Sequence, residues 1–142
     1  MVFAEKITYK FSQLDGFLEI LKGMQRMPLD GFLEDKILVG AAKYYLQVSI
    51  ECCLDIANHI IAAEHLRAPA DYADSFKVLE EHGIVKADEG MKLRQMAKFR
   101  NRLVHLYGDI DDAHVHDFIL NRLQDIVSFE AAIASRFLSA RR

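Results

Sequence analysis

The sequence predicts an all-helical fold, an antiparallel bundle of about five helices, and three observations support this prediction. Only two of the 142 residues are proline and the seven glycines are scattered, which favours long helices over a β-sandwich with many turns. Apolar residues recur every three or four positions in the long segments. The connectors between these segments are short, so consecutive helices are expected to lie antiparallel.

The composition favours one folded domain over residues 1–142. Of the residues, 51% are apolar and 27% are charged, the usual balance of a globular domain. A chain of this length can bury a core without disulfides or a metal, and it leaves no room for a second folded unit.

The first helix is expected at about 4–24, where Pro28 in the following connector prevents its continuation. Its apolar positions show the helical period: Phe11, Leu14, Leu18 and Leu21. The second helix, about 31–65, is the longest and is apolar around much of its circumference. Such a helix either lies at the centre of a protein or has a face reserved for another subunit.

A short third helix is expected at 75–83, after a loop that contains Pro69. Asp74 or Ser75 can cap its start, because a short polar side chain accepts a hydrogen bond from the first helical N–H groups. Gly83 can end it in a left-handed conformation.

Two further helices complete the predicted bundle. Asp88 is expected to cap the fourth, which continues to Gly108, where the chain can turn. Asp111 or Asp112 is expected to start the fifth, which reaches about Leu138.

Other features of the chain indicate a cytoplasmic protein. Cys52 and Cys53 are adjacent, a geometry that disfavours a disulfide, and no C-x-x-C zinc spacing exists. The N-terminal segment lacks the pattern of a signal peptide, and charges interrupt the apolar runs, so no membrane span is expected. The net charge of −3 argues against a protein that coats nucleic acid, but it permits a local basic site.

The fourth expected helix concentrates positive charge in this acidic chain. No acidic residue occurs over 91–108. The cations there are Lys92, Arg94, Lys98, Arg100 and Arg102. Asn101, His105 and Tyr107 follow at the C-terminal end, so a guanidinium, an amide, an imidazole and a phenol converge. By itself, this pattern also fits a solvated basic face with a histidine near the negative end of the helix dipole.

Helix geometry limits how these side chains can meet. At about 100° per residue, Arg100 and Tyr107 share a face, whereas Arg100 and His105 lie about 140° apart around the axis. Either the helix unwinds near His105, or the pair functions together with its symmetry mate across a dimer interface.

The stretch FRNRLVHLYGDID resembles the signature of the HEPN superfamily, specifically its HepT branch of toxin–antitoxin proteins. That signature is an Arg, often followed by a polar residue, and then a His, here Arg100, Asn101 and His105. The HepT branch has a Tyr two residues after the His, here Tyr107.

The resemblance extends over nearly the whole chain. The segment YYLQVSIECCLDIANHIIA and the helix after GDID look like those of the same family. So does a spaced connector pattern consisting of Pro69, Tyr72, Phe76 and Leu79.

The resemblance implies a helical homodimer that cleaves RNA without a metal or other cofactor. HepT-like proteins form a composite Arg–His cleft at the dimer interface. Each is typically encoded beside a small nucleotidyltransferase of the MntA type, the antitoxin of a type VII-like pair. That partner adds AMP to the motif tyrosine, here Tyr107, and silences the toxin.

The roles that the resemblance suggests are chemically reasonable. Imidazole titrates near neutrality, so two copies of His105 can act as acid and base when the 2′-OH attacks the phosphate. Arg100 can stabilise the dianionic phosphorane. Asn101 can orient His105 or a phosphate oxygen, and Tyr107 can also bond to phosphate. AMP on Tyr107 would block RNA by bulk and negative charge.

Further cations of the same helix are candidates for binding RNA, possible substrates being tRNA and mRNA: Arg94, Lys98 and Arg102. Two other functions stay open, a non-catalytic nucleotide- or substrate-binding partner of a small nucleotidyltransferase, and a purely structural helical dimer. The structural dimer has no need of Arg100, His105 and Tyr107, whereas the binding partner could use the same cleft.

Acidic and histidine residues elsewhere have open or ordinary interpretations. Glu51 and Asp55 either form a polar stripe or a salt bridge to a neighbouring helix, or one of them orients Arg100. His114 and His116 are two apart and point apart on a helix, so we interpret them as a solvated helix start. Asp109 and its neighbours are expected to cap the fifth helix, and no metal site is predicted.

Overall fold

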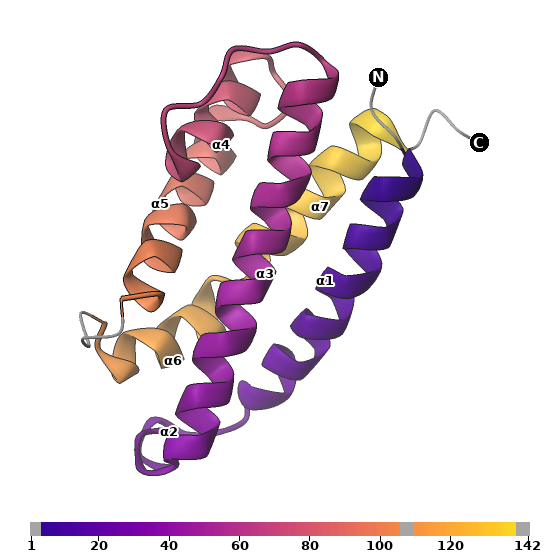
Figure 1. Cartoon of the computed structure of the whole chain (residues 1–142). Coiled ribbons are helices and arrows are strands. Elements are labelled where there is room, and N and C mark those ends of the chain that lie inside the picture. Colours follow the sequence, from indigo (N-terminus) through magenta and orange to yellow (C-terminus); the bar gives the residue numbers. More distant parts are fainter. Residues whose placement is uncertain (1–3, 106–109, 139–142) are drawn as a thin grey trace.

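The computed structural model describes residues 4–105 and 110–138, and the regular structure in them is helical (Figure 1). The helices are α1 (Ala4–Met24), α2 (Leu29–Glu34), α3 (Lys36–Ala63), α4 (Tyr72–Glu81), α5 (Ala87–Leu103), α6 (Asp112–Asn121) and α7 (Leu123–Phe137). The long helix α3 runs through the middle and contacts each of the other helices (Figure 1). Its apolar circumference is therefore explained first by a central position.

The expected second helix is divided in two at Asp35. This residue has an extended backbone, and its carboxylate accepts a hydrogen bond from the N–H of Leu38 at 3.0 Å. An aspartate competes with the helix in this way, and it is favoured at a helix start. The short helix α2 therefore ends at Glu34, and α3 begins afresh at Lys36.

The expected fifth helix is also divided, at Arg122. The Arg122 backbone leaves the helical region, and its guanidinium donates to Asp125 at 2.7 Å and to Gln95 of α5 at 3.0 Å. Helix α6 can then pack against α2 and α3 while α7 packs against α5. The described residues thus form seven helices rather than about five.

Two predicted helix starts are wrong by a few residues. The side chain of Asp71, rather than Asp74 or Ser75, accepts from the N–H of Asp74 at 2.8 Å, so α4 begins at Tyr72. Helix α5 begins after Lys86 rather than at Asp88.

The carboxylate of Glu89, which was not predicted as a cap, accepts from the N–H of Lys86 at 2.9 Å and satisfies one donor at the start of α5. Two predicted helix ends are confirmed, at Gly83 and at Asp111. Gly83 has φ +70° after α4 and takes part in a Schellman motif, in which Ile84 donates to the carbonyl of Leu79 at 3.0 Å. Asp111 caps α6 by accepting from Ala113 at 3.0 Å.

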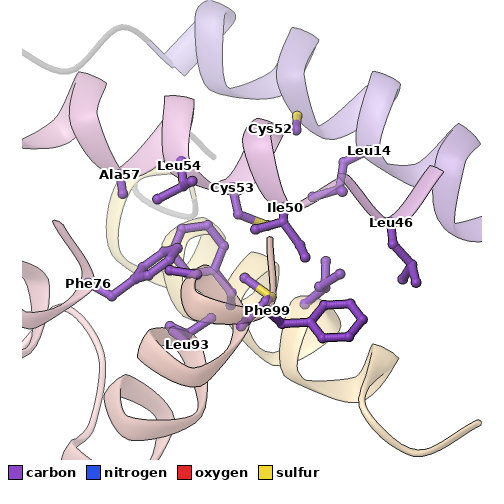
Figure 2. Packing of buried hydrophobic residues seen from close by; sticks show 14 of the residues in the cluster. Leu14, Leu46, Ile50, Cys52, Cys53, Leu54, Ala57, Phe76, Leu93 and Phe99 are labelled. Atoms are coloured by element: carbon purple, nitrogen blue, oxygen red, sulfur yellow. The ribbon is translucent and has the colours of Figure 1, made fainter. Parts of the chain in front are cut away.

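One cluster of buried apolar side chains includes residues of all seven helices. In Figure 2, Ile50 and Cys53 of α3 point toward Phe76 of α4 and Phe99 of α5. Both cysteines are free and buried, which confirms the expected thiols. Burial raises the pKa of the Cys52 thiol to about 11 and that of Cys53 well above its ordinary value, so both stay protonated.

Among the described residues, α3 is the one helix long and apolar enough to cross a membrane by length and composition. Charges interrupt this helix, as expected, at Lys43, Glu51 and Asp55, and the absence of a membrane span stays a prediction. Contacts with the other helices explain this composition, because the helix at the centre of a bundle is apolar on several sides.

Candidate active site

Arg100 is bound by a carboxylate from the central helix. Its Nε and Nη2 donate to the same oxygen, Oε2 of Glu51 in α3, at 3.0 and 2.6 Å. The Arg100 side chain is only 17% exposed, and that of Glu51 is 33% exposed. Of the two open interpretations of the acidic pair, Glu51 orients Arg100, whereas Asp55 forms an ion pair with Lys10 of α1 at 3.0 Å.

Two further side chains contact the guanidinium of Arg100, and a third contacts the Glu51 carboxylate that binds it. Its Cζ lies 4.8 Å from the centre of the Tyr72 ring, in cation–π geometry. Its Nη1 donates to Oδ1 of Asn101 at 3.3 Å, and Gln47 donates to the Glu51 carboxylate at 3.2 Å. Groups from α3, α4 and α5 therefore fix the plane and position of this cation.

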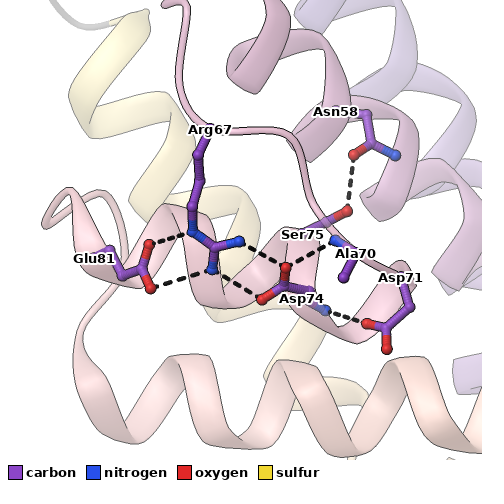
Figure 3. A network of polar contacts seen from close by, with 7 residues as sticks. All are labelled: Asn58, Arg67, Ala70, Asp71, Asp74, Ser75 and Glu81. Atoms are coloured by element: carbon purple, nitrogen blue, oxygen red, sulfur yellow. Dashed lines mark hydrogen bonds and ion pairs between the residues drawn. The ribbon is translucent and has the colours of Figure 1, made fainter.

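An ion-pair network orders the start of α4, where Tyr72 lies (Figure 3). Arg67 donates two hydrogen bonds to Asp74 at 2.7 and 2.9 Å and two to Glu81 at 2.8 and 3.1 Å. Asp74 also accepts from the N–H of Ala70 at 2.8 Å. These hydrogen bonds hold the pKa of Asp74 well below its usual range. The loop before Tyr72 is thereby attached to α4 at several points.

The other motif residues lie beyond the end of α5. The helix ends at Leu103 rather than at Gly108, and His105 is exposed, with its N–H bonded to the carbonyl of Arg102 at 3.3 Å. The helix thus unwinds before His105, one of the two alternatives that the 140° separation left open. Tyr107 and Asp109 lie outside the described residues. Among the described residues, the hydrogen bonds of Arg100 go to Glu51 and Asn101, so one chain does not join Arg100 directly to His105.

The remaining cations of α5 differ in their surroundings. Arg94 forms an ion pair with Glu80 of α4 at 2.5 Å, which lowers the pKa of that carboxyl, so the charge of Arg94 is largely offset. Lys98 and Arg102 are exposed on the side of α5 that faces α6. Arg102 donates to Nδ1 of His114 at a distance of 3.4 Å.

The interpretation of both histidines of α6 as a solvated helix start is wrong for His116. This side chain is only 6% exposed, donates from Nε2 to the carbonyl of Met27 at 2.8 Å, and packs against Phe32. His114 is exposed and points to α5 instead. Over 4–105 and 110–138, no three His, Cys, Asp or Glu side chains are grouped as metal ligands would be.

Comparison with known proteins identifies the family. Residues 14–133 match the family described as ribonuclease HepT-like. The chain belongs to the HepT-like family. A protein named mRNA nuclease HepT, from Shewanella oneidensis, is 31% identical over 111 residues, 77% of this chain and 84% of the relative. A protein named tRNA nuclease HepT, from Aphanizomenon flos-aquae, is 26% identical over 125 residues, 87% of this chain and 84% of the relative.

Solved structures show the same HepT-like fold. A Shewanella oneidensis structure, described as a tri-AMPylated HEPN toxin in complex with its MNT antitoxin, superposes with a TM-score of 0.84 at 26% identity. It covers 91% of this chain and 96% of that one. The cytosolic protein YutE from Bacillus subtilis, 22% identical, has a TM-score of 0.84 over 98% of this chain and 93% of its own, which shows a shared fold.

Two side chains at this HepT-like site were not predicted as site residues. Tyr72 was noted only as part of a connector pattern, and Gln47 was not singled out. Aromatic and amide residues on different helices give no signal until the helices are packed together. The acidic pair within an otherwise apolar helix, Glu51 and Asp55, was the one sequence feature that pointed to a contact with Arg100, and the structure gives that contact to Glu51.

Proposed function

We propose that this chain is the toxin of a type VII-like toxin–antitoxin pair, a metal-independent endoribonuclease whose catalytic residues are Arg100 and His105. The observation that carries this proposal is the fixed guanidinium of Arg100, bound by Glu51 and Tyr72, at the helix end that precedes the exposed imidazole of His105. Membership of the HepT-like family supports the same reaction class.

The proposed reaction needs only side-chain chemistry. An imidazole removes the proton of a ribose 2′-OH, the oxygen attacks the neighbouring phosphorus, and the 5′-oxygen leaves with a proton from an acid. Arg100 balances the two negative charges of the phosphorane. Asn101, already bonded to Arg100, supports its orientation or contacts a phosphate oxygen. Tyr107 would contact phosphate as well.

A homodimer would supply the acid and the base from two copies of His105. Exposed residues of α3 support this part of the proposal, since Ile37 is 86% and Tyr44 56% exposed. These two residues and Glu51 recur every seven positions, so they share one face of α3. A second copy that covered this face would lie next to Arg100 in each chain.

A nucleotidyltransferase antitoxin of the MntA type would regulate the site by adding AMP to Tyr107. The Shewanella structure supports this part, since it is described as a tri-AMPylated toxin with its antitoxin. An AMP group adds bulk and negative charge where RNA phosphates must bind, so it would exclude substrate. The relatives named as nucleases of mRNA and tRNA make both RNAs candidates, and both are found in the cytoplasm.

The test is cleavage of purified tRNA and total RNA by the protein alone, with a chelator present. Cleavage is expected in the parent protein and is expected to be lost in Arg100→Ala and in His105→Ala. Cleavage that stops with chelator, or that survives in both variants, contradicts the proposal.

The same geometry is compatible with a second function, that of a non-catalytic nucleotide- or substrate-binding partner of the nucleotidyltransferase. Nε, Nη1 and Nη2 of Arg100 already donate to Glu51 and Asn101 within one chain, an arrangement that suits binding as well as catalysis. If protein that lacks AMP on Tyr107 by mass spectrometry does not cleave RNA, this second function replaces the first.

A further inference from the structure

A groove between α5 and α6 lies on the opposite side of α5 from Arg100. It has a volume of about 340 Å³. Its walls and floor are formed by Lys98, Arg102, His114 and Arg122 over Phe99 and Phe118. We call this the cationic groove. Figure 1 shows where α5 ends beside α6, the region in which the groove is found.

The charge of the cationic groove is unusual for this chain. The protein has a net charge of −3, yet the lining residues include no carboxylate and three cations, of which Arg122 is paired with Asp125 outside the lining. Lys98 and Arg102 are four apart on α5, so two like charges are neighbours on one helix face, which disfavours the helix. Their Cα atoms lie about 6 Å apart along the axis by helix geometry. An anion bound between them could contact both side chains.

The surroundings of the groove fix its shape. Phe99 and Phe118 stack face to face at 4.3 Å, which joins α5 to α6 beneath the cations. Arg122 donates to Gln95 at 3.0 Å and to Asp125, whose side chain is only 8% exposed. The wall formed by Arg122 is therefore held in one place before any ligand binds.

His114 adds a directional donor to the groove. Arg102 can only donate, so the Nδ1 of His114 that it contacts at 3.4 Å must accept, and the ring proton lies on Nε2. The imidazole also packs edge-on against Phe99, with ring centres 5.3 Å apart. The groove thus combines two cations and an oriented N–H group, which suits phosphate oxygens.

The groove adjoins the motif histidine. The backbone carbonyl of Arg102 accepts from the backbone N–H of His105, so His105 follows Arg102 within one turn at the end of α5. Arg100, two residues before Arg102, points to the other side of the same helix, toward α3. A nucleic-acid strand in the groove would therefore reach His105 along one side of α5.

We propose that the cationic groove binds the phosphodiester backbone of a single RNA strand beside the cleaved bond. This inference rests on the proposed ribonuclease function and names the part of its substrate that lies outside the Arg–His cleft. Lys98 and Arg102 contact successive phosphates, and His114 donates to a phosphate oxygen. Arg94 is excluded from this role, because it is paired with Glu80 on α4.

The test measures binding of a fluorescein-labelled 2′-O-methyl RNA of about 12 nucleotides, within the usual size of single-strand sites, by anisotropy over a range of salt. The probe has RNA phosphates but no 2′-OH, so binding is separated from cleavage. Each lost phosphate contact lowers the slope of log affinity against log salt by about 0.7 on a single strand. For Lys98→Gln with Arg102→Gln, we expect a slope lower by about 1.4 and binding roughly 25-fold weaker near 0.1 M salt.

Lys92→Gln is the control for the loss of one positive charge outside the groove, because Lys92 lies at an exposed position of α5 near Glu89 and Asp125. It is expected to bind the probe like the parent protein. An unchanged slope in the double variant, or an equal loss in Lys92→Gln, overturns the inference. So does a double variant that binds the probe normally but loses the nucleotidyltransferase, since the groove would then dock a protein.

The two proposals fail in different ways. A parent protein that does not cleave RNA but binds the probe with a groove-dependent slope contradicts the ribonuclease and supports the groove. A parent protein that cleaves RNA, with a double variant that binds the probe normally, contradicts the groove alone. Circular dichroism of all variants checks that the exposed substitutions leave the helices intact.

Discussion

Replacing Tyr72 tests whether the aromatic face positions Arg100 for catalysis. The Arg100 guanidinium lies 4.8 Å from the ring centre, its side chain is 17% exposed, and Tyr72 is 45% exposed. The contact is therefore partly exposed to solvent. We expect it to contribute about 1 kcal/mol, between the values for exposed and for desolvated cation–π pairs. That energy corresponds to roughly a fivefold change in rate.

We expect Tyr72→Ala to lower kcat/KM for RNA cleavage about fivefold, and Tyr72→Phe to leave it nearly unchanged, because phenylalanine retains the aromatic face. Alanine suits the first position of α4, so the backbone should be preserved. The assay is steady-state cleavage of a fluorogenic RNA, with thermal melting to separate activity from stability.

A double-mutant cycle decides whether Tyr72 acts through Arg100. If Tyr72 positions the guanidinium, Tyr72→Ala has little further effect on the residual activity of Arg100→Ala. Equal losses in the parent and Arg100→Ala backgrounds, or equal losses for the Phe and Ala variants, would refute the reasoning.

Three further predictions concern the fold. Burial raises the pKa of Glu130 to about 8, helped by a hydrogen bond with Asp15. The protonated carboxyl therefore stabilises the fold fully below about pH 4.5, and this contribution is lost as the pH rises through 8. We expect the melting temperature of Glu130→Gln to fall less than that of the parent protein between pH 6 and 9, and an equal fall in both would contradict this. Phe76→Ala, at a fully buried ring, should lower the free energy of unfolding by about 3–5 kcal/mol in urea titration, and a loss below about 1 kcal/mol would mean that the site collapses around the cavity. Gly83→Ala should lower the free energy of unfolding by roughly 1–2 kcal/mol, because the backbone there has φ +70°. Gly16→Ala, inside α1 with open space around it, should raise the free energy of unfolding by about 0.5–1 kcal/mol. Changes of the same sign in both variants would be inconsistent with this backbone explanation.

The helical class and one helix end could be predicted from the sequence, because both depend on residues that are close together along the chain. Helical periodicity predicted the helical class, and the glycine at 83 predicted a left-handed helix end that φ +70° confirms. The breaks at Asp35 and Arg122 were not predicted. A periodic apolar pattern continues across both positions, and it does not specify the partners that the two side chains find, the N–H of Leu38 for Asp35 and the carboxylate of Asp125 for Arg122.

The candidate site divides in the same way. The sequence by itself determined which residue types are available at the end of α5, because Arg100, Asn101 and His105 are close along the chain. The packing of helices far apart in sequence decided what surrounds Arg100, since Glu51 and Tyr72 reach it from α3 and α4. It also distinguished the cations of α5, which look equivalent in sequence. The positive charge of Arg94 is offset by the Glu80 carboxylate of α4, whereas Lys98 lines a groove that has no carboxylate in its lining. The local charge around each cation depends on which side chains the fold brings near it, and these come from other helices.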